Sequence, residues 1–488
     1  MTEMKEIPEA SSPFTGNTAK DLKALTELFN RSSDLVIREI LFGQRRIFVF
    51  LLDGMCDEIK ITEGIIKPLT EKHPHSEEMP FNEAIKKRLF KGTIVRSTAT
   101  IEDAAYNIIL GNLVILAENE KEALAFSVQG FARKPPDEPS SEQNERGSRE
   151  GFTDNFKDNI TLLRRRLRTP KLTIRQETLG KASNTPTVIC YMSDRVSRDT
   201  LDEILRRLKK IDLDAVLGSG YLRPFLDMSR PSFFTDTGIT ERPDTFASML
   251  LEGRVGIIVD GTPFALIVPY LFTDYFHAVD DYLASPYYAL FMRILRAVCF
   301  IIAAILPGAF VAISLFHPEI MPADIMYGIS AASSKTPFPI MIEALTIHFI
   351  YEIVREAGLR MPRSVGHAVS IVGALVIGDA AVTAGLIAAP MLIVVALTAI
   401  SSSVTVRLHE PVAILRFGFI IIGGFTGLYG IMLGIGIMIV DICSVSPYGI
   451  PLSAPVSPFV KKAQADTLIR RSWTRLDYGK KLIQRMKF

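Results

Sequence analysis

An unusually apolar tract in the C-terminal half limits what this chain can fold into. Charged side chains become scarce between residues 297 and 441, and residues 364–406 contain a single formal charge, Asp379. At a rise of about 1.5 Å per residue, these 43 residues are long enough to cross a hydrocarbon layer of roughly 30 Å twice. No water-soluble core requires such a stretch. The sequence therefore predicts an integral membrane protein in which Pro390 separates two crossings.

Two soluble units are expected ahead of this tract. A chain of 488 residues exceeds what one hydrophobic core organises, and its first 290 or so residues carry most of the charged side chains. The fold class that we predict is an α/β cytoplasmic N-terminal region of two mixed α/β units, followed by an α-helical polytopic membrane domain. The predicted boundaries are a polar tail at 1–29, α/β units at 30–132 and 152–275, an exposed linker at 133–151, a connector at 276–296, a transmembrane domain of about four to six helical segments at 297–441 and a basic tail at 442–488.

Local patterns within the two units predict strands joined by tight turns. β-Branched and aromatic runs end in Asp-Gly at two places, and the second is followed closely by another apolar run, which predicts a hairpin. Helices are expected where the apolar residues recur with helical spacing. The expected strands are 45–52, 113–117, 123–128, 254–259 and 264–268, and the expected helices are 156–167 and 201–208.

Motifs of catalysis and nucleotide binding are missing from the sequence. It contains no GxxxxGK[ST], GxSxG or HExxH pattern and no glycine-rich phosphate loop between a strand and a helix. Its four cysteines are scattered without a CxxC pair. We therefore expect no enzyme activity, no cofactor and no metal site.

A cluster of arginines lies on the helix expected at 156–167. Arg164, Arg165 and Arg166 could contact nucleic acid, but leucines share this helix and no aromatic platform is interleaved. We expect no nucleic-acid partner. The role that we favour for these three residues, together with Arg149, is contact with another subunit or with lipid headgroups.

Flanking charges orient the first membrane helix. Arg293 and Arg296 precede the span expected at 297–316, so the positive-inside tendency places the α/β units in the cytoplasm. Prolines in this span and before the next helix are expected to kink the chain or to take part in gating. These candidates are Pro307, Pro337 and Pro339.

The helix expected at 340–354 is too polar to face lipid. Glu343 and Glu352 are nine residues apart and point to roughly opposite faces, with His348 between them. One carboxylate could line a water-filled path. The alternative is an amphipathic helix at the interface, with both carboxylates in headgroup water. Asp379 is either a buried helix contact or a permeation site, so the candidates for a pore or ion path are Glu343, His348, Glu352 and Asp379.

Glycines recur along the last apolar stretch, residues 412–440. In an apolar helix such small residues allow close helix approach rather than phosphate binding. The helix-packing candidates are Gly423, Gly427, Gly430 and Gly434.

The charge of the C-terminal segment creates a topology problem. Residues 461–488 contain nine Lys or Arg against two Asp, which suits contact with anionic lipid or simple solvation. Five full crossings would put this tail on the side opposite the N-terminal units, against the positive-inside tendency. A re-entrant helix around Glu343 would restore an even number of crossings.

Several long passages follow a known pattern. They are SREGFTDNFKDNITLLRRRLRTPKL (148–172), ERPDTFASMLLEGRVGIIVDGTPFALIVP (241–269) and EAGLRMPRSVGHAVSIVGALVIGDAAVTAGL (356–386), with FHPE (316–319) and VVALTAISS (394–402). Together they resemble the A subunit of GerA-type spore germinant receptors. The resemblance covers about residues 35–445, although VTVRLHEP (404–411) departs from the family's pattern.

The resemblance implies a role in spore germination. Such receptors are similar in combining an A subunit with a transporter-like B subunit, which binds the nutrient, and a lipoprotein C subunit. For this chain it implies a homo-oligomer in the inner membrane of the spore, acting as a nutrient-gated monovalent-cation channel in contact with lipids and both partner subunits. The alternatives are a paralogous spore channel downstream of germinant sensing and a non-conducting scaffold for receptor assembly.

Overall fold

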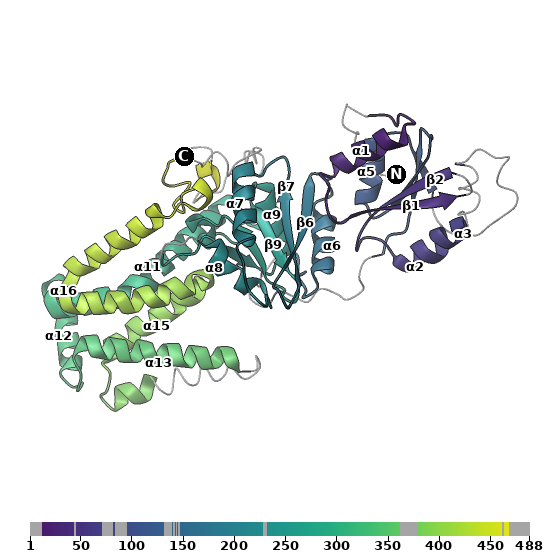
Figure 1. Ribbon diagram of the computed structural model, residues 1–488. Helices are drawn as coiled ribbons and strands as arrows, with labels where there is room; N and C mark the ends of the chain where they lie inside the picture. The colour runs from purple at the N-terminus through teal and green to yellow at the C-terminus, as the bar shows by residue number, and fades with distance from the viewer. Residues whose placement is uncertain are drawn as a thin grey trace.

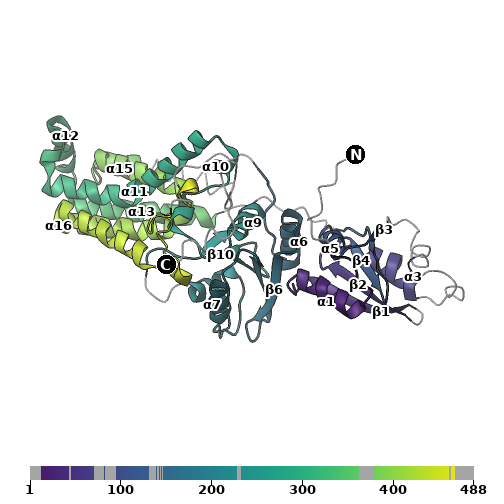
Figure 2. The same cartoon turned by 90° about the horizontal axis from the view of Figure 1, so that it is seen from above.

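Two α/β units and a bundle of long helices lie in a row along the molecule (Figure 1, Figure 2). The computed structural model describes residues 12–42, 45–70, 82, 95–130, 139, 142, 144, 147–227, 232–361, 378–460 and 463–467. The order of an α/β region followed by a helical region confirms the predicted fold class. Residues 364–377, where the first part of the expected double crossing falls, and the tail from residue 468 lie outside the described residues.

The first unit is built on an antiparallel sheet with the strand order β1-β2-β4-β5-β3. Its elements are α1 (Thr18–Leu28), β1 (Leu35–Phe42), β2 (Arg45–Leu52), α2 (Glu58–Ile61), a π-helical turn (Thr62–Ile66), α3 (Lys67–Thr70), β3 (Val95–Thr98), α5 (Ile101–Ile109), β4 (Leu113–Ala117) and β5 (Ala123–Phe126). Strands β4 and β5 pair with each other and are buried throughout, as expected for an apolar hairpin. Leu25 of α1 and Phe14 also join this core, so part of the stretch predicted as a polar tail belongs to the unit.

The second unit repeats this plan with the strand order β6-β7-β9-β10-β8. Its elements are α6 (Phe156–Arg166), β6 (Leu172–Leu179), β7 (Thr185–Met192), α7 (Arg198–Leu208), α8 (Arg223–Leu226), β8 (Gly238–Thr240), α9 (Pro243–Leu251), β9 (Val255–Val259), β10 (Ala265–Val268) and α10 (Asp280–Leu283). Helices α6 and α9 pack on one face of the sheet, and α7 and α8 pack on the other. Because both faces are covered, β9 and β10 are apolar at every position instead of alternating. The predicted hairpin across Asp260 and Gly261 is confirmed.

A buried ion pair joins the two α/β units. Arg164 of α6 donates from Nε to Asp34 Oδ2 at 2.8 Å and from Nη2 to Ser32 Oγ at 3.1 Å. Both charged side chains are almost fully enclosed. The predicted contact of Arg164 with another subunit or a headgroup is therefore wrong, because its guanidinium is used inside the chain.

The helical bundle extends away from the second unit. Its elements are α11 (Pro286–Phe316), α12 (Ala323–Ser333), α13 (Ile340–Arg360), α15 (Ala389–Val404) and α16 (His409–Ser444). Among the described helices, α11 and the segment containing α16 are long and apolar enough to cross a membrane. We call the end of the bundle beside the second unit the near end, and the end that carries α12 the far end (Figure 1, Figure 2). Helix α11 begins 11 residues before the predicted span, within the expected connector.

Helix α16 is broken at Gly427, whose φ of 65° and ψ of −152° are not helical. Figure 1 shows the two arms of α16 meeting at an angle. The arms fold back on each other, because a Cβ atom on Gly434 would lie 2.7 Å from the Phe419 ring. The turn between them is at the far end, where Gly427 faces Phe316, the last residue of α11. Only glycine adopts such backbone angles readily.

This break resolves the topology problem differently from the prediction. Helix α13 is continuous over 21 residues, or about 31 Å, so the expected re-entrant helix around Glu343 is not what reverses the chain. The reversal occurs in α16, whose second arm ends with Asp441 hydrogen-bonded to Ser232 of the second unit at 3.0 Å. The segment after α16 therefore starts on the same side as the α/β units.

Candidate ion path and domain junction

Glu343 is part of the packing at the far end of the bundle. It accepts a hydrogen bond from the main-chain N–H of Ala388 at 2.6 Å, and Thr336 Oγ1 lies 3.5 Å from it. Ala388 is the residue before α15, so the carboxylate caps the N-terminus of that helix. Glu343 is 1% exposed, which contradicts the alternative of an interfacial helix with this carboxylate in headgroup water.

Glu352 lies nine residues further along α13, near its middle, and gathers three donor groups. Arg416 Nη1 donates to Glu352 Oε1 at 3.0 Å, and Arg355 Nε donates to Oε2 at 3.1 Å. His409 Nε2 lies 3.6 Å from the same carboxylate. Arg416 is fully buried and also donates to the carbonyl of Ala303 in α11. Glu352 thus ties α13 to α16 and, through Arg416, to α11.

His348 is enclosed one helical turn before Glu352. Its side chain is fully buried, and neither ring nitrogen has a hydrogen-bond partner among the described residues. Glu343, His348 and Glu352 therefore do not form one continuous exposed row on a single chain. The structure brings His348 and Glu352 together and leaves Glu343 at the far end.

Asp379 is the exception among the four candidates, because it is exposed. It lies among the helical residues 378–383, which precede the turn at 384–388. Gly378, its neighbour, packs against Leu392 of α15. The segment therefore runs beside α15.

The proline and glycine candidates mark bends and close contacts. Pro307 is buried inside α11, while Pro337 and Pro339 lie in the bend before α13. Gly423 meets the Gly308 carbonyl of α11, which confirms close helix approach at this position. Gly430 faces Thr426 and Ile422 of its own helix across the break.

Two of the remaining arginine candidates, Arg165 and Arg166, lie beside Glu150. Arg166 Nη2 is 2.8 Å and Arg165 Nη1 is 3.6 Å from its carboxylate. Arg165 keeps 42% of its side chain exposed. Arg149 also interacts with neighbouring groups. An external contact remains a prediction for Arg149, Arg165 and Arg166.

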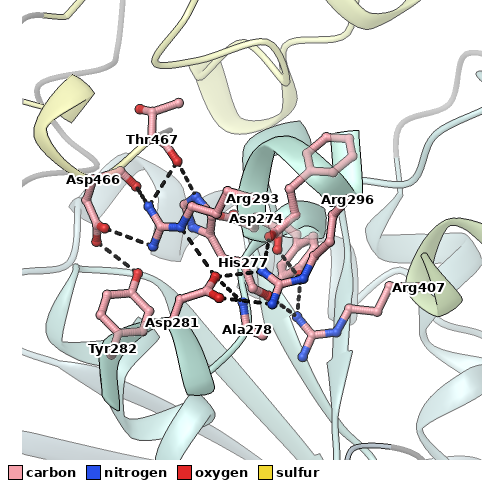
Figure 3. Close-up of polar contacts among 12 residues, drawn as sticks. Asp274, His277, Ala278, Asp281, Tyr282, Arg293, Arg296, Arg407, Asp466 and Thr467 are labelled. Atoms are coloured by element: carbon pink, nitrogen blue, oxygen red, sulfur yellow. Dashed lines mark hydrogen bonds and ion pairs between the residues drawn. The ribbon is translucent and has the colours of Figure 1, made fainter. Parts of the chain in front are cut away.

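A network of arginines and carboxylates joins the second unit to the near end of the bundle (Figure 3). Arg293 and Arg296 of α11 both bind Asp281, with Nε of Arg293 at 3.3 Å and Nη1 of Arg296 at 2.7 Å. Arg293 also binds Asp466 and the carbonyl of Thr467. These contacts fasten the start of α11 to the unit and to the segment after α16.

Arg407, between α15 and α16, reaches the same region. Its Nη2 donates to Glu142 Oε1 at 2.7 Å, and its Nη1 donates to Tyr270 Oη at 3.0 Å and to the carbonyl of His277. Arg254 binds Asp274 beneath this contact. Burial by itself would raise the pKa of Asp274, but the charge of Arg254 holds that pKa below its ordinary value. Burial, and then Arg293, lowers the pKa of His277, whose Nε2 is 2.8 Å from the carbonyl of Thr467.

This domain junction is absent from the sequence-based prediction. From the sequence, Arg293 and Arg296 indicate only a positive charge before a membrane span. Their partners Asp281 and Asp466 are 185 residues apart, and no local pattern joins them. One sequence signal does point to this region. Residues 404–411, which contain Arg407, depart from the pattern of the GerA-type A subunits.

A family model described as the Bacillus/Clostridium GerA spore germination protein matches residues 23–481. The chain belongs to the GerA family. The resemblance predicted from its sequence passages is thereby confirmed.

Several GerA relatives match along nearly their whole length. Spore germination protein KA of Bacillus subtilis (strain 168) is 38% identical over 474 residues, covering 96% of this chain and 86% of that protein. Spore germination protein GerLA of Bacillus cereus is 31% identical over 463 residues, covering 93% of each chain. The uncharacterized membrane protein YfkQ of Bacillus subtilis (strain 168) is 35% identical over 474 residues, covering 96% of this chain and 92% of that protein.

A solved structure is also similar to part of this chain. It is the N-terminal domain of the A subunit of the Bacillus megaterium spore germinant receptor GerK3, with 26% identity and a TM-score of 0.44. The match covers 54% of this chain and 99% of that domain.

Proposed function

We propose that this GerA-family chain is the membrane subunit of a nutrient germinant receptor, and that copies of it assemble into a ligand-gated channel for monovalent cations. The channel opens when a transporter-like B subunit binds nutrient, in a complex that also contains a lipoprotein C subunit. The bundle crosses the inner membrane of the spore, and the two α/β units are on the cytoplasmic side.

The observation that carries the proposal is the exposure of Asp379. This carboxylate is exposed on the single chain although it lies in the most apolar tract of the sequence. A charged side chain facing hydrocarbon costs several kcal/mol, so an exposed one must face water or a neighbouring subunit. A ring of such carboxylates around an oligomer axis favours cations in a pore.

The domain junction supplies a route for gating. Asp281, Asp466 and Glu142 are held by Arg293, Arg296 and Arg407, which lie at the ends of bundle helices. A partner that moved the second unit would therefore pull on α11 and on the connection between α15 and α16. Nutrient binding would shift the equilibrium from the closed to the open channel only as far as the complex binds nutrient more tightly in the open state.

The first test is ion conduction by the full-length chain in planar bilayers, alone and with its co-purified partner subunits and nutrient. We expect cation-selective conductance whose selectivity falls in Asp379→Asn. The matched control is Asp324→Asn, which removes an exposed carboxylate from α12 at the same end of the bundle. Equal selectivity in wild type and Asp379→Asn would remove this residue from the pore.

A non-conducting scaffold is the second candidate, and one observation favours it. Glu343, Glu352 and His348 are all engaged or enclosed within one chain, so three of the four predicted ion-path residues are not free to line a pore. Absence of conductance in the complete complex with nutrient, while the complex still assembles, would establish the scaffold. Conductance that needs no partner would instead favour the paralogous channel downstream of sensing.

A further inference from the structure

A small polar pocket lies in the first α/β unit, where the ends of three neighbouring strands meet the end of α5. Its volume is about 210 Å³, and the polar residues among its described lining are Arg96, Asn107, Asn112, Ser127 and Gln129. Arg96 is the second residue of β3, Asn112 directly precedes β4, and Ser127 directly follows β5. Sites for drug-sized ligands usually measure roughly 300–1,000 Å³. This pocket therefore suits a ligand of few non-hydrogen atoms.

A chain of hydrogen bonds fixes the direction of the Asn112 side chain. The main-chain carbonyl of Asp103 can only accept, so Asn107 turns its Nδ2 toward it, at 2.9 Å. Asn107 Oδ1 then accepts from Asn112 Nδ2 at 3.1 Å, and Asn112 Oδ1 points away from Asn107. This oxygen is buried, and no donor in the described part of the chain binds it. A ligand or an ordered water in the pocket would supply the missing donor.

The other polar groups of the lining are mainly donors. The Arg96 side chain is exposed, and its guanidinium makes no hydrogen bond or ion pair with the residues that the structure describes. Gln129 Nε2 donates one N–H to the carbonyl of Leu110 at 2.8 Å, which leaves its second N–H available. Burial raises the pKa of Asp103 and the nearby charge of Arg96 opposes that rise, but Asp103 is not among the described lining residues. The described lining thus offers a cation and amide donors without a carboxylate.

These groups select the charge and the chemistry of the ligand. The planar guanidinium of Arg96 matches a carboxylate or a phosphate in a bidentate contact. One cation balances the single charge of a carboxylate, whereas a phosphate monoester carries close to two charges near pH 7. Asn112 Oδ1 needs a hydroxyl or an ammonium as its donor, and an ammonium would find no carboxylate among the described lining residues. A hydroxyl is therefore favoured.

We propose that this pocket binds a small hydroxy carboxylate, whose carboxylate pairs with Arg96 and whose hydroxyl donates to Asn112 Oδ1. Both contacts come from the first unit alone. The site therefore depends on neither the bundle nor the domain junction, and ligand binding and ion conduction can be tested separately.

Ligand-observed NMR of the purified full-length protein in deuterated detergent tests the pocket. The probes are L-lactate, propionate and L-alanine, which share a methyl group and a carboxylate. They differ in the group on Cα, which is a hydroxyl, a hydrogen or an ammonium. Saturation transferred from the protein to each methyl group is followed through a titration, which gives a dissociation constant for each probe. Inorganic phosphate is then added as a competitor of lactate.

We expect lactate to bind about two- to tenfold more tightly than propionate, because its hydroxyl adds one hydrogen bond. Alanine should bind most weakly. Arg96→Gln should weaken the binding of lactate and propionate by at least several-fold, because both lose their ion pair. Arg38→Gln is the matched control, since Arg38 is also exposed and lies on β1, the opposite edge strand of the same sheet. It should leave binding unchanged.

Asn112→Ala separates the two contacts. Loss of the Oδ1 acceptor should bring lactate to the affinity of propionate while propionate binds as in wild type, and unchanged propionate binding also shows that the variant is folded. Arg96→Gln is the independent variant, because it changes an exposed side chain. Equal binding of the three acids to wild type, or no binding at all, would mean that the pocket holds only water and would overturn the proposal. Tighter binding of alanine or phosphate than of lactate, or unchanged binding in Arg96→Gln, would also overturn it.

Discussion

Gly308 of α11 and Gly423 of α16 bring two helix backbones into direct contact. A Cβ atom on Gly308 would lie 2.4 Å from the carbonyl oxygen of Phe419, and one on Gly423 would lie 2.5 Å from the carbonyl oxygen of Gly308. Real Cβ atoms do not approach backbone so closely, so neither position has room for a side chain. The contact lies toward the far end of α11 and of the first arm of α16, four residues before the break at Gly427, and it fixes the distance between the two longest described helices of the bundle.

Gly308→Ala is expected to destabilise the bundle, because its methyl group can be accommodated only by moving α16 away from α11. Overpacking of this kind costs about 1–3 kcal/mol. Thermal unfolding of the purified protein in detergent measures the effect. Gly436→Ala is the matched control, because a Cβ atom there meets nothing within 4 Å. It should leave stability unchanged or raise it slightly through helix propensity. Equal thermal unfolding midpoints for Gly308→Ala and Gly436→Ala would contradict the close contact between α11 and α16.

Arg164→Ala is expected to weaken the connection between the α/β units. The change leaves Asp34 buried without its cation, and breaking one side of a buried pair costs about 3–5 kcal/mol. Arg165→Ala on the same helix removes a partly exposed arginine and should cost less than about 1 kcal/mol. Chemical unfolding of both variants measures the difference. If Arg164→Ala were as mild as Arg165→Ala, the pair would not hold the units together.

Local patterns were sufficient for the elements whose partners are near in sequence. The strands expected at 45–52 and 113–117 have those bounds in the structure, because β-branched runs bounded by turn residues leave little choice of conformation. The hairpin at Asp260 was found for the same reason. Helix α11 includes the expected span at 297–316 and begins 11 residues before it, at Pro286.

Contacts between distant segments were not accessible from local patterns. The sequence favours contact of Arg164 with another subunit or with lipid headgroups, because its partner Asp34 lies 130 residues earlier and no local pattern links the two. The break of α16 was also missed, although Gly427 was noted among several glycines. Nothing local distinguishes a glycine that permits close packing from one that adopts a positive φ. Of the ion-path candidates, Asp379 is exposed and Glu352 is partly buried, whereas Glu343 and His348 are buried.

Glu343→Gln is expected to behave like wild type, and Glu343→Leu is not. Glutamine keeps an oxygen that accepts the hydrogen bond from Ala388, whereas leucine leaves that buried N–H without a partner at a cost of about 1–3 kcal/mol. Thermal midpoints and bilayer conductance should be measured on both variants. A stable Glu343→Gln protein with altered cation selectivity would show that this carboxylate lines the path after all, and that its cap on α15 is not its main role.

His277 should make the protein sensitive to mild acid. Its pKa lies below the ordinary value because of burial and Arg293, so the folded chain holds it neutral while the unfolded chain takes up a proton near pH 6.5. Stability is therefore present above about pH 6.5 and is lost as the pH falls through that value toward the folded pKa, by no more than about 1.4 kcal/mol per pH unit. His277→Gln keeps a donor for the carbonyl of Thr467 but does not titrate. Thermal unfolding measured between pH 7 and pH 5 tests this. The unfolding temperature of wild type should fall more steeply with falling pH than that of His277→Gln. Parallel curves would mean that this imidazole carries no acid sensitivity and that the domain junction responds to pH through other groups.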